Sequence, residues 1–171
     1  IERVMGAQAG ANSAFPAADL TLIGPDGVDM HDTSEDIAAA LAQGRARDIQ
    51  AGHTLSGPHR VDLGALYSAK GVEARQCSTG EQKALLISLI LANARALSED
   101  FGAPPILLLD EVAAHLDADR RAALYEEICA LGVQAFITGT ELELFAGLGK
   151  RAQFFEVTES AGTSSIVERN E

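Results

Sequence analysis

Two groups of polar residues in the middle of the chain have the types and spacing to act on a phosphate group. The sequence Ser-Thr-Gly-Glu-Gln-Lys over Ser78–Lys83 opens a long apolar stretch, and the apolar run Ile106–Leu109 ends in the adjacent carboxylates of Asp110 and Glu111. A helix N-terminus offers backbone N–H groups and a positive dipole end to a phosphate. Phosphoryl transfer also needs a magnesium ion, held partly by an aspartate, and a group that orients the attacking water. We therefore expect half of a nucleotide-hydrolysing site, in which Asp110 serves the metal and Glu111 the water.

The loop that would wrap the phosphates of the nucleotide is missing from these 171 residues. No G-x-x-x-x-G-K-[ST] pattern occurs, and the only Gly-Lys pair, Gly149-Lys150, lacks both the earlier glycine and a following hydroxyl residue. The sequence therefore indicates one half of an ATPase, and we expect no measurable hydrolysis by this chain alone.

Each motif also has a purely structural interpretation. The S-x-x-E pattern is a capping box found before many helices that bind no ligand. An Asp-Glu pair after a strand can simply open a loop, and in an arbitrary protein that would be the favoured interpretation. The four apolar residues before Asp110, together with the upstream Ser78 motif, favour the functional interpretation here. Capping and phosphate binding can hold together at Ser78.

The elements that must position these residues form a predicted α/β unit. Ser78 caps a helix whose run from Ala84 to Leu97 is apolar nearly all round, so this helix is expected to be buried on several sides. Gly102–Pro105 ends it, and Ile106–Leu109 then predicts a buried central parallel strand. A helix capped by Asp117 then runs through Leu131 and is closed by Gly132. A second buried strand at Gln134–Thr138 completes a βαβ unit.

The flanking sequence predicts further strands, helices and turns. Before the central unit, an edge strand is expected at Leu20–Ile23, closed by Gly24–Gly27, and a helix at Glu35–Arg47, capped by Thr33 or Ser34 and with an apolar face of Ile37, Ala38 and Leu41. A hairpin of Leu63–Tyr67 and Val72–Arg75 around Ser68–Gly71 follows. After the central unit, a short helix is expected at Glu141–Leu148, and then a hairpin of Gln153–Val157 and Ser164–Glu168 around Ser160–Thr163.

Composition limits the classes of protein that remain. The length and a 47% hydrophobic content fit one domain with a real core. A net charge of −12 argues against this chain being the main surface that grips nucleic acid phosphates. Cys77 and Cys129 offer neither a disulfide framework nor metal-ligand spacing. The apolar stretch Ala84–Ala92 is too short for a membrane span, and the first residues lack a secretory leader. We expect a cytoplasmic, truncated chain.

The order of these motifs resembles that of ABC-type ATPases of the SMC, Rad50 and RecF group. Ser78–Lys83 is similar to their signature motif, Ile106–Glu111 to Walker B, and His115-Leu116-Asp117 to the D-loop. Three further segments are similar to the RecF branch in particular: Arg45–Asp48, Gly57-Pro58-His59-Arg60 followed by Asp62-Leu63, and Phe136–Thr140.

The resemblance implies an α/β fold, the C-terminal lobe of an ABC-type ATPase head, with parallel strands flanked by helices and a terminal hairpin. Residues 1–50 would lead from the arm region, residues 51–171 would carry the signature, Walker B and D-loop motifs, and the Walker A half would lie outside this sequence. The cofactors implied are ATP and Mg²⁺. In that family two subunits meet head to tail, and each ATP lies between one subunit's Walker A and the other's signature motif.

Residue roles follow from the same resemblance. The signature residues would meet a nucleotide held by a second copy, with Ser78 and Gly80 at its γ-phosphate and the remaining members around them: Thr79, Glu81, Gln82 and Lys83. Asp110 would hold the metal and Glu111 would act on the water, both on the chain's own nucleotide. Asp117 serves equally well as a D-loop residue or as a plain N-cap.

Two segments keep open roles. Thr138-Gly139-Thr140-Glu141 stands where many ABC proteins have a switch histidine, so sensing of the γ-phosphate and the role of Thr138 are open. Gly57, Pro58, His59 and Arg60 are typical of the family, but a Gly-Pro turn followed by a polar pair is more often structural.

The function implied by the resemblance concerns a longer protein of DNA replication, recombination and repair. That protein would bind ATP and double-stranded DNA, dimerise, hydrolyse ATP, and help load recombinase at gaps with RecO- and RecR-like mediator partners. Two alternatives stay open: a non-catalytic interaction module that keeps the fold, and an ATPase head of the SMC or Rad50 branch. The Gly57–Arg60 segment weighs against the second.

Overall fold

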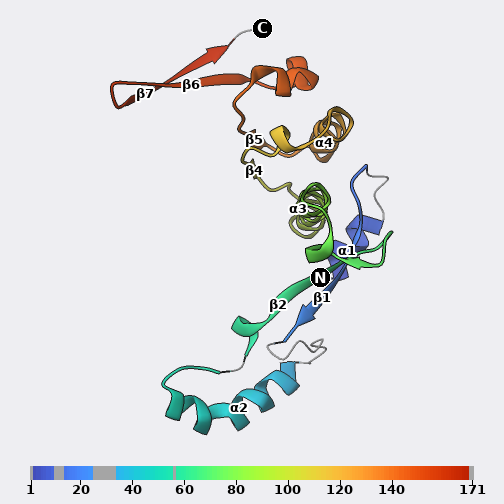
Figure 1. The fold of residues 1–171 in the computed structure, drawn as a ribbon, viewed down its shortest axis with the longest axis vertical. Helices are drawn as coiled ribbons and strands as arrows, with labels where there is room; N and C mark the ends of the chain where they lie inside the picture. Colours follow the sequence, from blue (N-terminus) through green and yellow to red (C-terminus); the bar gives the residue numbers. More distant parts are fainter. Residues whose placement is uncertain (1, 10–13, 25–33, 56, 170–171) are drawn as a thin grey trace. The chain divides into compact units, whose positions relative to one another are not determined.

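The computed structural model describes residues 2–9, 14–24, 34–55 and 57–169. These residues fall into two compact units, Ile1–Asn93 and Ala94–Glu171, and the long helix α3 (Thr79–Phe101) belongs to both along the sequence (Figure 1). The expected division near residue 50 stays a prediction. The turn predicted at Gly24–Gly27 and the cap predicted at Thr33 lie largely outside the described residues.

The first unit contains a three-stranded antiparallel sheet in the order β1-β2-β3. Its strands are β1 (Ala18–Ile23), β2 (Asp62–Tyr67) and β3 (Val72–Glu73). The predicted hairpin around Ser68–Gly71 and the edge position of β1 are confirmed. The second hairpin strand is shorter than predicted, because the chain turns into a 3₁₀ helix, η2 (Ala74–Gln76). Ala18, Leu20 and Leu85 form the centre of the small core beneath this sheet.

Two helices precede the hairpin. The short α1 (Glu2–Ala9) was not predicted, and it is fastened by a polar contact, since the buried amide of Gln8 donates to Ser88 Oγ at 2.9 Å and accepts from Ala18 N at 3.3 Å. The helix α2 (Ser34–Ala51) extends beyond the predicted end, and Ser34 is its first residue rather than a residue before it. Its expected apolar face is only half-buried at Ile37 and Leu41 and is exposed at Ala38.

The helix α3 confirms the strongest helix prediction, since it begins directly after the predicted cap Ser78 and ends directly before Gly102. Its buried residues occupy most of its circumference, as expected for a run that is apolar nearly all round, and they are Ala84, Leu85, Ile87, Ser88, Leu91, Ala92, Ala94 and Ala96. Among the leucines of this run Leu89 and Leu97 are half-buried, and Leu86 is exposed over 58% of its surface.

The second unit is built on the predicted βαβ arrangement. The strands β4 (Leu107–Leu109) and β5 (Ala135–Ile137) pair in parallel, connected through the 3₁₀ turn η3 (Ala113–His115) and the helix α4 (Ala118–Leu131). Gly132 ends α4 in the left-handed conformation with φ 63°, as a helix C-cap requires. Parallel pairing brings the carboxyl ends of both strands to the same edge of the sheet.

One prediction about β4 is wrong. Ile106–Leu109 was expected to be buried, but only Leu107 and Leu109 are, while Ile106 and Leu108 expose 62% and 77% of their surfaces. Successive side chains of a strand point to opposite faces, and β5 is the only strand paired with β4 among the described residues. The expected burial of the returning strand is wrong as well, because Ala135 and Ile137 of β5 are only half-buried and Phe136 is 54% exposed. One face of this small sheet is therefore apolar and uncovered in the described chain.

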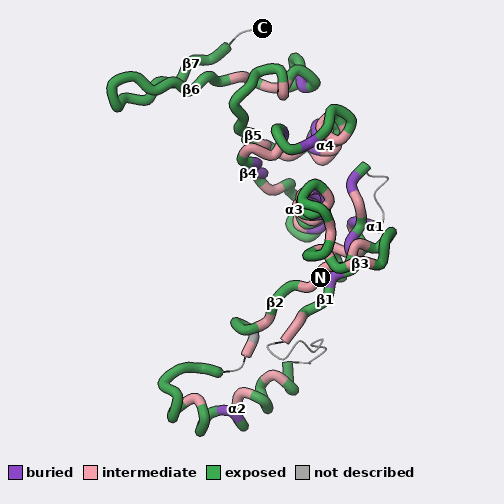
Figure 2. The backbone as a smooth tube through the Cα atoms, viewed as in Figure 1, coloured by how far each residue is buried: buried purple, intermediate pink, exposed green. Residues whose placement is uncertain are grey.

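The last elements are η4 (Leu142–Arg151) and the hairpin of β6 (Phe154–Ser160) and β7 (Thr163–Arg169). The predicted helix at Glu141–Leu148 is a 3₁₀ segment instead, interrupted at Gly149 by a φ of 48°. The predicted hairpin is confirmed, with a two-residue turn in which Ala161 and Gly162 have φ of 52° and 77°. Figure 2 shows this hairpin as exposed along nearly all its length. Among the described residues, no helix combines the length and apolar character that a membrane crossing needs.

Candidate functional site

Ser78 and Glu81 form a capping box at the start of α3. Ser78 N donates to Glu81 Oε2 at 2.9 Å, and Glu81 N donates to Ser78 Oγ at 3.4 Å. The Ser78 hydroxyl also donates to Glu81 Oε2 at 2.8 Å. These reciprocal bonds satisfy two of the backbone N–H groups that a helix start leaves without partners. The predicted cap is therefore confirmed.

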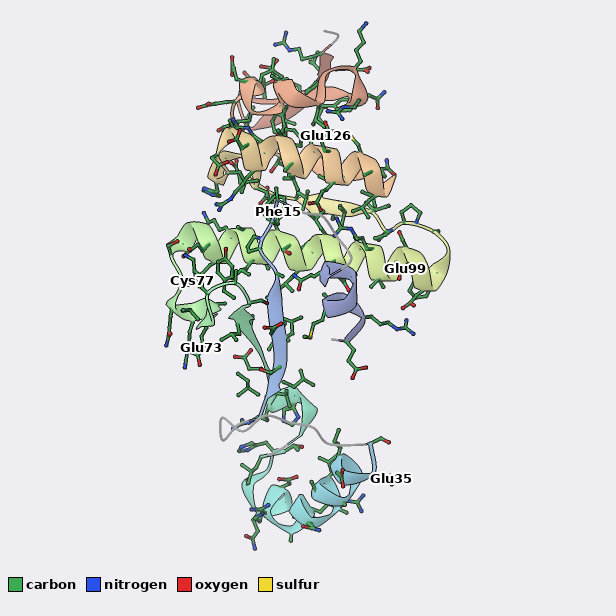
Figure 3. The ribbon with its side chains drawn as sticks, turned by 90° about the vertical axis from the view of Figure 1, so that its right-hand side faces the viewer. Phe15, Glu35, Glu73, Cys77, Glu99 and Glu126 are labelled. Atoms are coloured by element: carbon green, nitrogen blue, oxygen red, sulfur yellow. The ribbon has the colours of Figure 1, made fainter. Side chains whose placement is uncertain are left out.

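Gln82 ties the same turn to the residue before it. Its backbone N–H donates to Ser78 O at 2.9 Å, and its side-chain amide reaches back to Cys77 O at 3.2 Å. The thiol of Cys77 in turn lies 3.6 Å from Glu73 O. Cys77 and Glu73 both lie at the approach to the first turn of α3 (Figure 3). The turn is thus fixed on both sides of Ser78.

Lys70 is a member of this cluster that sequence reasoning missed. Its ammonium group forms an ion pair with Glu81 Oε1 and lies 5.5 Å from the centre of the Tyr67 ring. The hydrogen bond from Lys70, followed by the bonds from Ser78, lowers the pKa of Glu81 to about 2. The only sequence signal is a basic residue at the tip of the β2–β3 hairpin, and such a pattern does not reveal which helix start it meets.

The surface of the turn is open. Ser78, Thr79, Gly80 and Gln82 are exposed, while Glu81 and Lys83 are half-buried. A Cβ added to Gly80 would meet no atom within 4 Å. Packing within the described chain therefore does not require glycine at this position.

The second group of predicted residues lies at the carboxyl edge of the β4–β5 sheet. Thr138 N donates to Leu109 O at 3.0 Å, which continues the parallel ladder past both strands. The Thr138 hydroxyl donates to Asp110 Oδ1 at 2.5 Å and accepts from Glu111 N at 3.0 Å. Asp110 is exposed and Glu111 is half-buried. The sheet edge thus brings Asp110, Glu111 and Thr138 together, at the position where open α/β sheets bind ligands.

Glu111 has an unusual backbone. Its φ is 54°, one of two positive values among non-glycine residues of the described chain. L-residues avoid this left-handed region because Cβ crowds the following carbonyl oxygen. The chain direction therefore changes sharply just after Asp110, and the bond from Glu111 N to Thr138 secures that change.

The segment after Glu111 is organised around Asp117 and Arg121. Asp117 Oδ1 accepts from Arg120 N at 2.8 Å, so its role as N-cap of α4 is confirmed. The Arg121 guanidinium donates to Leu116 O at 3.0 Å and to Ala113 O at 3.5 Å. His115 is exposed at the end of η3. Any second role of Asp117 stays a prediction.

The Gly57–Arg60 segment is a turn. Pro58–Arg60 forms the 3₁₀ helix η1, Arg60 N donates to Gly57 O at 2.9 Å, and His59 Nε2 lies 3.4 Å from Thr54 O. Gly57 has φ of 147°, which favours glycine. These contacts fit the structural interpretation of the segment.

The donor set at Asp110 fits a metal that arrives with a phosphate. No group of three or more His, Cys, Asp or Glu side chains within the described ranges could hold a metal ion. Mg²⁺ is commonly bound through one or two carboxylates together with substrate phosphates and waters. Asp110 supplies one exposed carboxylate of that kind.

Comparisons with known proteins identify similar sequences and folds, although no family model matches. The chain is 50% identical over 160 residues to the DNA replication and repair protein RecF of Agrobacterium fabrum, covering 90% of the chain and 42% of that protein. It is 54% identical over 154 residues to RecF of Rhizobium johnstonii, covering 86% of the chain and 40% of that protein. The chain thus spans about two fifths of the length of these relatives.

Solved structures share the fold. The recombination mediator protein RecF with ATPrS, of the RecFOR pathway, matches 97% of this chain with a TM-score of 0.61 and 23% identity. A structure from a study of ATP-driven dimerisation and DNA-stimulated activation of SMC ATPases matches 99% of the chain with a TM-score of 0.56 and 15% identity. The fold is therefore that of a portion of the RecF and SMC ATPase heads.

Proposed function

We propose, from the homology of this chain to part of the RecF proteins, that it is the C-terminal lobe of a RecF-like ATPase of DNA replication and repair. The observation that carries the proposal is the meeting of Asp110, Glu111 and Thr138 at the carboxyl edge of a parallel sheet. The curated RecF relatives are 50% and 54% identical to the chain, which favours the RecF branch, whereas the SMC heads show only that the fold is shared.

Asp110 and Glu111 divide the chemistry of hydrolysis between them. Asp110 would be a ligand of Mg²⁺, and that ion, when bound with ATP, supplies positive charge to the phosphate oxygens. Glu111, one residue further along the chain, orients the attacking water and accepts its proton. This chain supplies no residues that wrap the α and β phosphates, so by itself it is inactive.

The turn formed by Ser78–Lys83, called the signature turn below, contacts the nucleotide of a second copy of the protein. Ser78 and Gly80 meet the γ-phosphate of an ATP held by that copy, so that ATP binding drives a head-to-tail dimer. Support comes from the exposure of both residues and from the open space around Gly80. The first turn of a helix also leaves backbone N–H groups free of intrahelical partners, and these attract a phosphate.

Contacts with DNA belong to the longer protein. This chain has a net charge of −12, which makes it a poor surface for the phosphate backbone. The longer cytoplasmic protein would bind double-stranded DNA and gap junctions, and would act with RecO- and RecR-like mediators in loading recombinase. Its hydrolysis of ATP then ends the bound state.

The test uses the longer polypeptide that carries this chain. Glu111→Gln should lower the hydrolysis rate by about 100-fold or more, because it removes a group that accepts a proton. The same variant should keep ATP-dependent self-association, measured by light scattering. Ser78→Arg should abolish that self-association, because it fills the space before the turn.

A matched control is Glu168→Gln in the exposed strand β7, which should hydrolyse ATP like the unmodified protein. Hydrolysis by Glu111→Gln at the rate of the Glu168→Gln control would refute the role given to Glu111. Self-association of Ser78→Arg with unchanged ATP dependence would refute the role of the signature turn.

A further inference from the structure

We propose that Thr138 is a positioning residue that fixes the orientation of the Asp110 carboxylate and the backbone of Glu111 through a single hydroxyl group. The inference rests on the proposed function, because it assigns a task to Thr138 within that hydrolytic site. Thr138 directly follows β5 at the carboxyl edge of the sheet, and its hydroxyl group contacts both Asp110 and Glu111.

The two neighbours of the Thr138 hydroxyl determine to which of them it donates and from which it accepts a hydrogen bond. A hydroxyl group has one proton to donate and two lone pairs to accept with. Glu111 N–H can only donate, so at 3.0 Å it must use a lone pair of Thr138 Oγ1. The hydroxyl proton is then directed to Asp110 Oδ1, at 2.5 Å. One group thus connects the side chain of Asp110 with the main chain of Glu111.

The two bonds restrict two groups that the proposed hydrolysis uses, namely the Asp110 carboxylate and the backbone of Glu111. The bond to Oδ1 stops the rotation of the Asp110 carboxylate and so orients its second oxygen, which is the oxygen left for a metal. The bond from Glu111 N holds a backbone whose φ of 54° is disfavoured for a residue with a Cβ. A strained backbone persists only where surrounding contacts hold it.

Thr138 is itself held by the sheet. It follows Ile137, the last residue of β5, and its N–H donates to Leu109 O at 3.0 Å across the parallel ladder. Its branched side chain restricts rotation about χ1. The hydroxyl is therefore carried by the ladder rather than by a free loop, as a positioning group must be.

The test compares Thr138→Val, which removes the hydroxyl at nearly the same volume, with Thr138→Ser, which keeps it. Thr163→Val, at the exposed start of β7, is the matched control for the loss of a threonine hydroxyl. The first measurement is amide hydrogen exchange at Glu111, which requires neither nucleotide nor activity. Exchange should be at least about 10-fold faster in Thr138→Val and close to the unmodified rate in the other two variants.

The second measurement is the Mg²⁺ concentration that gives half-maximal ATP hydrolysis by the longer polypeptide. Partners that orient a metal ligand typically change metal affinity or activity by about 10- to 100-fold. Thr138→Val should therefore raise this Mg²⁺ concentration at least about 10-fold. Thr138→Ser should restore it, and Thr163→Val should leave it unchanged. Protection of the β4–β5 ladder amides shows that each variant is folded.

The outcomes separate this inference from the proposed function. If Asp110→Ala abolishes hydrolysis while Thr138→Val matches the unmodified protein in Glu111 exchange or in Mg²⁺ dependence, the role of Thr138 is refuted and the proposed function stands. Faster exchange with unchanged Mg²⁺ dependence would mean a purely structural bond, and it also overturns the inference. If Asp110→Ala and Glu111→Gln both hydrolyse ATP normally, the proposed function falls and the inference falls with it.

Discussion

At the scale of single residues, Glu81 connects three parts of the first unit. Its carboxylate accepts from Ser78 N and Ser78 Oγ and pairs with Lys70 at the tip of the β2–β3 hairpin. The helix start, the residue that caps it and the hairpin therefore share one charged group. The ionisation of Glu81 should consequently control the geometry of the turn formed by Ser78–Gln82.

This linkage predicts a pH dependence whose sign follows from the pKa of Glu81. That pKa is lowered from its ordinary value of 4.5 to about 2 in the folded chain, mainly by the hydrogen bond from Lys70. A carboxyl group with a lowered pKa stabilises the fold above its unfolded-state value, and the contribution is lost as the pH falls from about 4.5 to about 2.

Lys70→Met should therefore raise the pKa of Glu81 toward 4.5, as measured by an NMR titration of the Glu81 carboxyl carbon. Loss of order in the first turn of α3 should then begin at a higher pH. Lys150→Met, which removes an exposed lysine from η4, is the control and should leave the Glu81 titration unchanged. Equal Glu81 titrations in Lys70→Met and the unmodified chain would contradict the linkage.

Gly80 allows folding and function to be tested separately. It lies in the first turn of α3 with open space around it, so Gly80→Ala should keep or raise the free energy of unfolding, by up to about 1 kcal/mol. In the longer polypeptide the added methyl group should weaken ATP-dependent self-association by about 5- to 150-fold, as crowding of about 1–3 kcal/mol in a close contact implies.

The matched control for Gly80 is Gly6→Ala in α1, where an added Cβ also meets no atom within 4 Å. Sedimentation with and without ATP measures the association, and urea unfolding measures the stability. Self-association of Gly80→Ala equal to that of Gly6→Ala would mean that no phosphate or partner approaches this glycine.

At the scale of elements, local sequence patterns correctly predicted the features that depend on contacts between residues close together in the chain. The capping box at Ser78, the N-cap at Asp117 and the βαβ unit follow from side-chain types at fixed spacings, and the structure contains all three. The ion pair of Lys70 with Glu81 and the bonds of Thr138 connect residues 11 to 28 positions apart, so no local pattern signals them. The helix α1 was missed because its stability depends on Gln8 and Ser88, 80 positions apart.

The helix α4 offers a test of its cap. Asp117→Ala should lower the free energy of unfolding by about 1 kcal/mol, because Arg120 N loses its acceptor at the helix start. Asp117→Asn should stay within a few tenths of a kcal/mol of the unmodified chain, since asparagine caps equally well. Urea unfolding followed by circular dichroism measures both variants.

Asp119→Ala is the control for loss of a first-turn carboxylate without loss of the cap. If Asp117→Ala and Asp119→Ala have equal stability, the cap contributes nothing. If Asp117→Asn keeps its stability but slows hydrolysis by the longer polypeptide, Asp117 has the D-loop role as well as the structural one.

At the scale of the whole molecule, the described chain has features of an incomplete surface. Ile106, Leu108 and Phe136 leave an apolar face of the β4–β5 sheet exposed, and contiguous exposed apolar surface usually marks a site of contact. The four apolar residues of this run predicted that β4 is buried on both faces. That prediction failed because an apolar run carries no information about which other strands are present beside it. The same run in a longer protein can be covered without any change in sequence.

The prediction that belongs to this scale concerns activity. The 171-residue chain, purified and supplied with ATP and Mg²⁺, should release phosphate no faster than its Asp110→Ala variant, because it contains no glycine-rich loop to hold the α and β phosphates. The longer polypeptide should hydrolyse ATP, and Asp110→Ala should abolish that activity. Phosphate release by the short chain that disappears on Asp110→Ala would instead show that these residues form a complete site, and the division of the site between two parts of a longer protein would have to be abandoned.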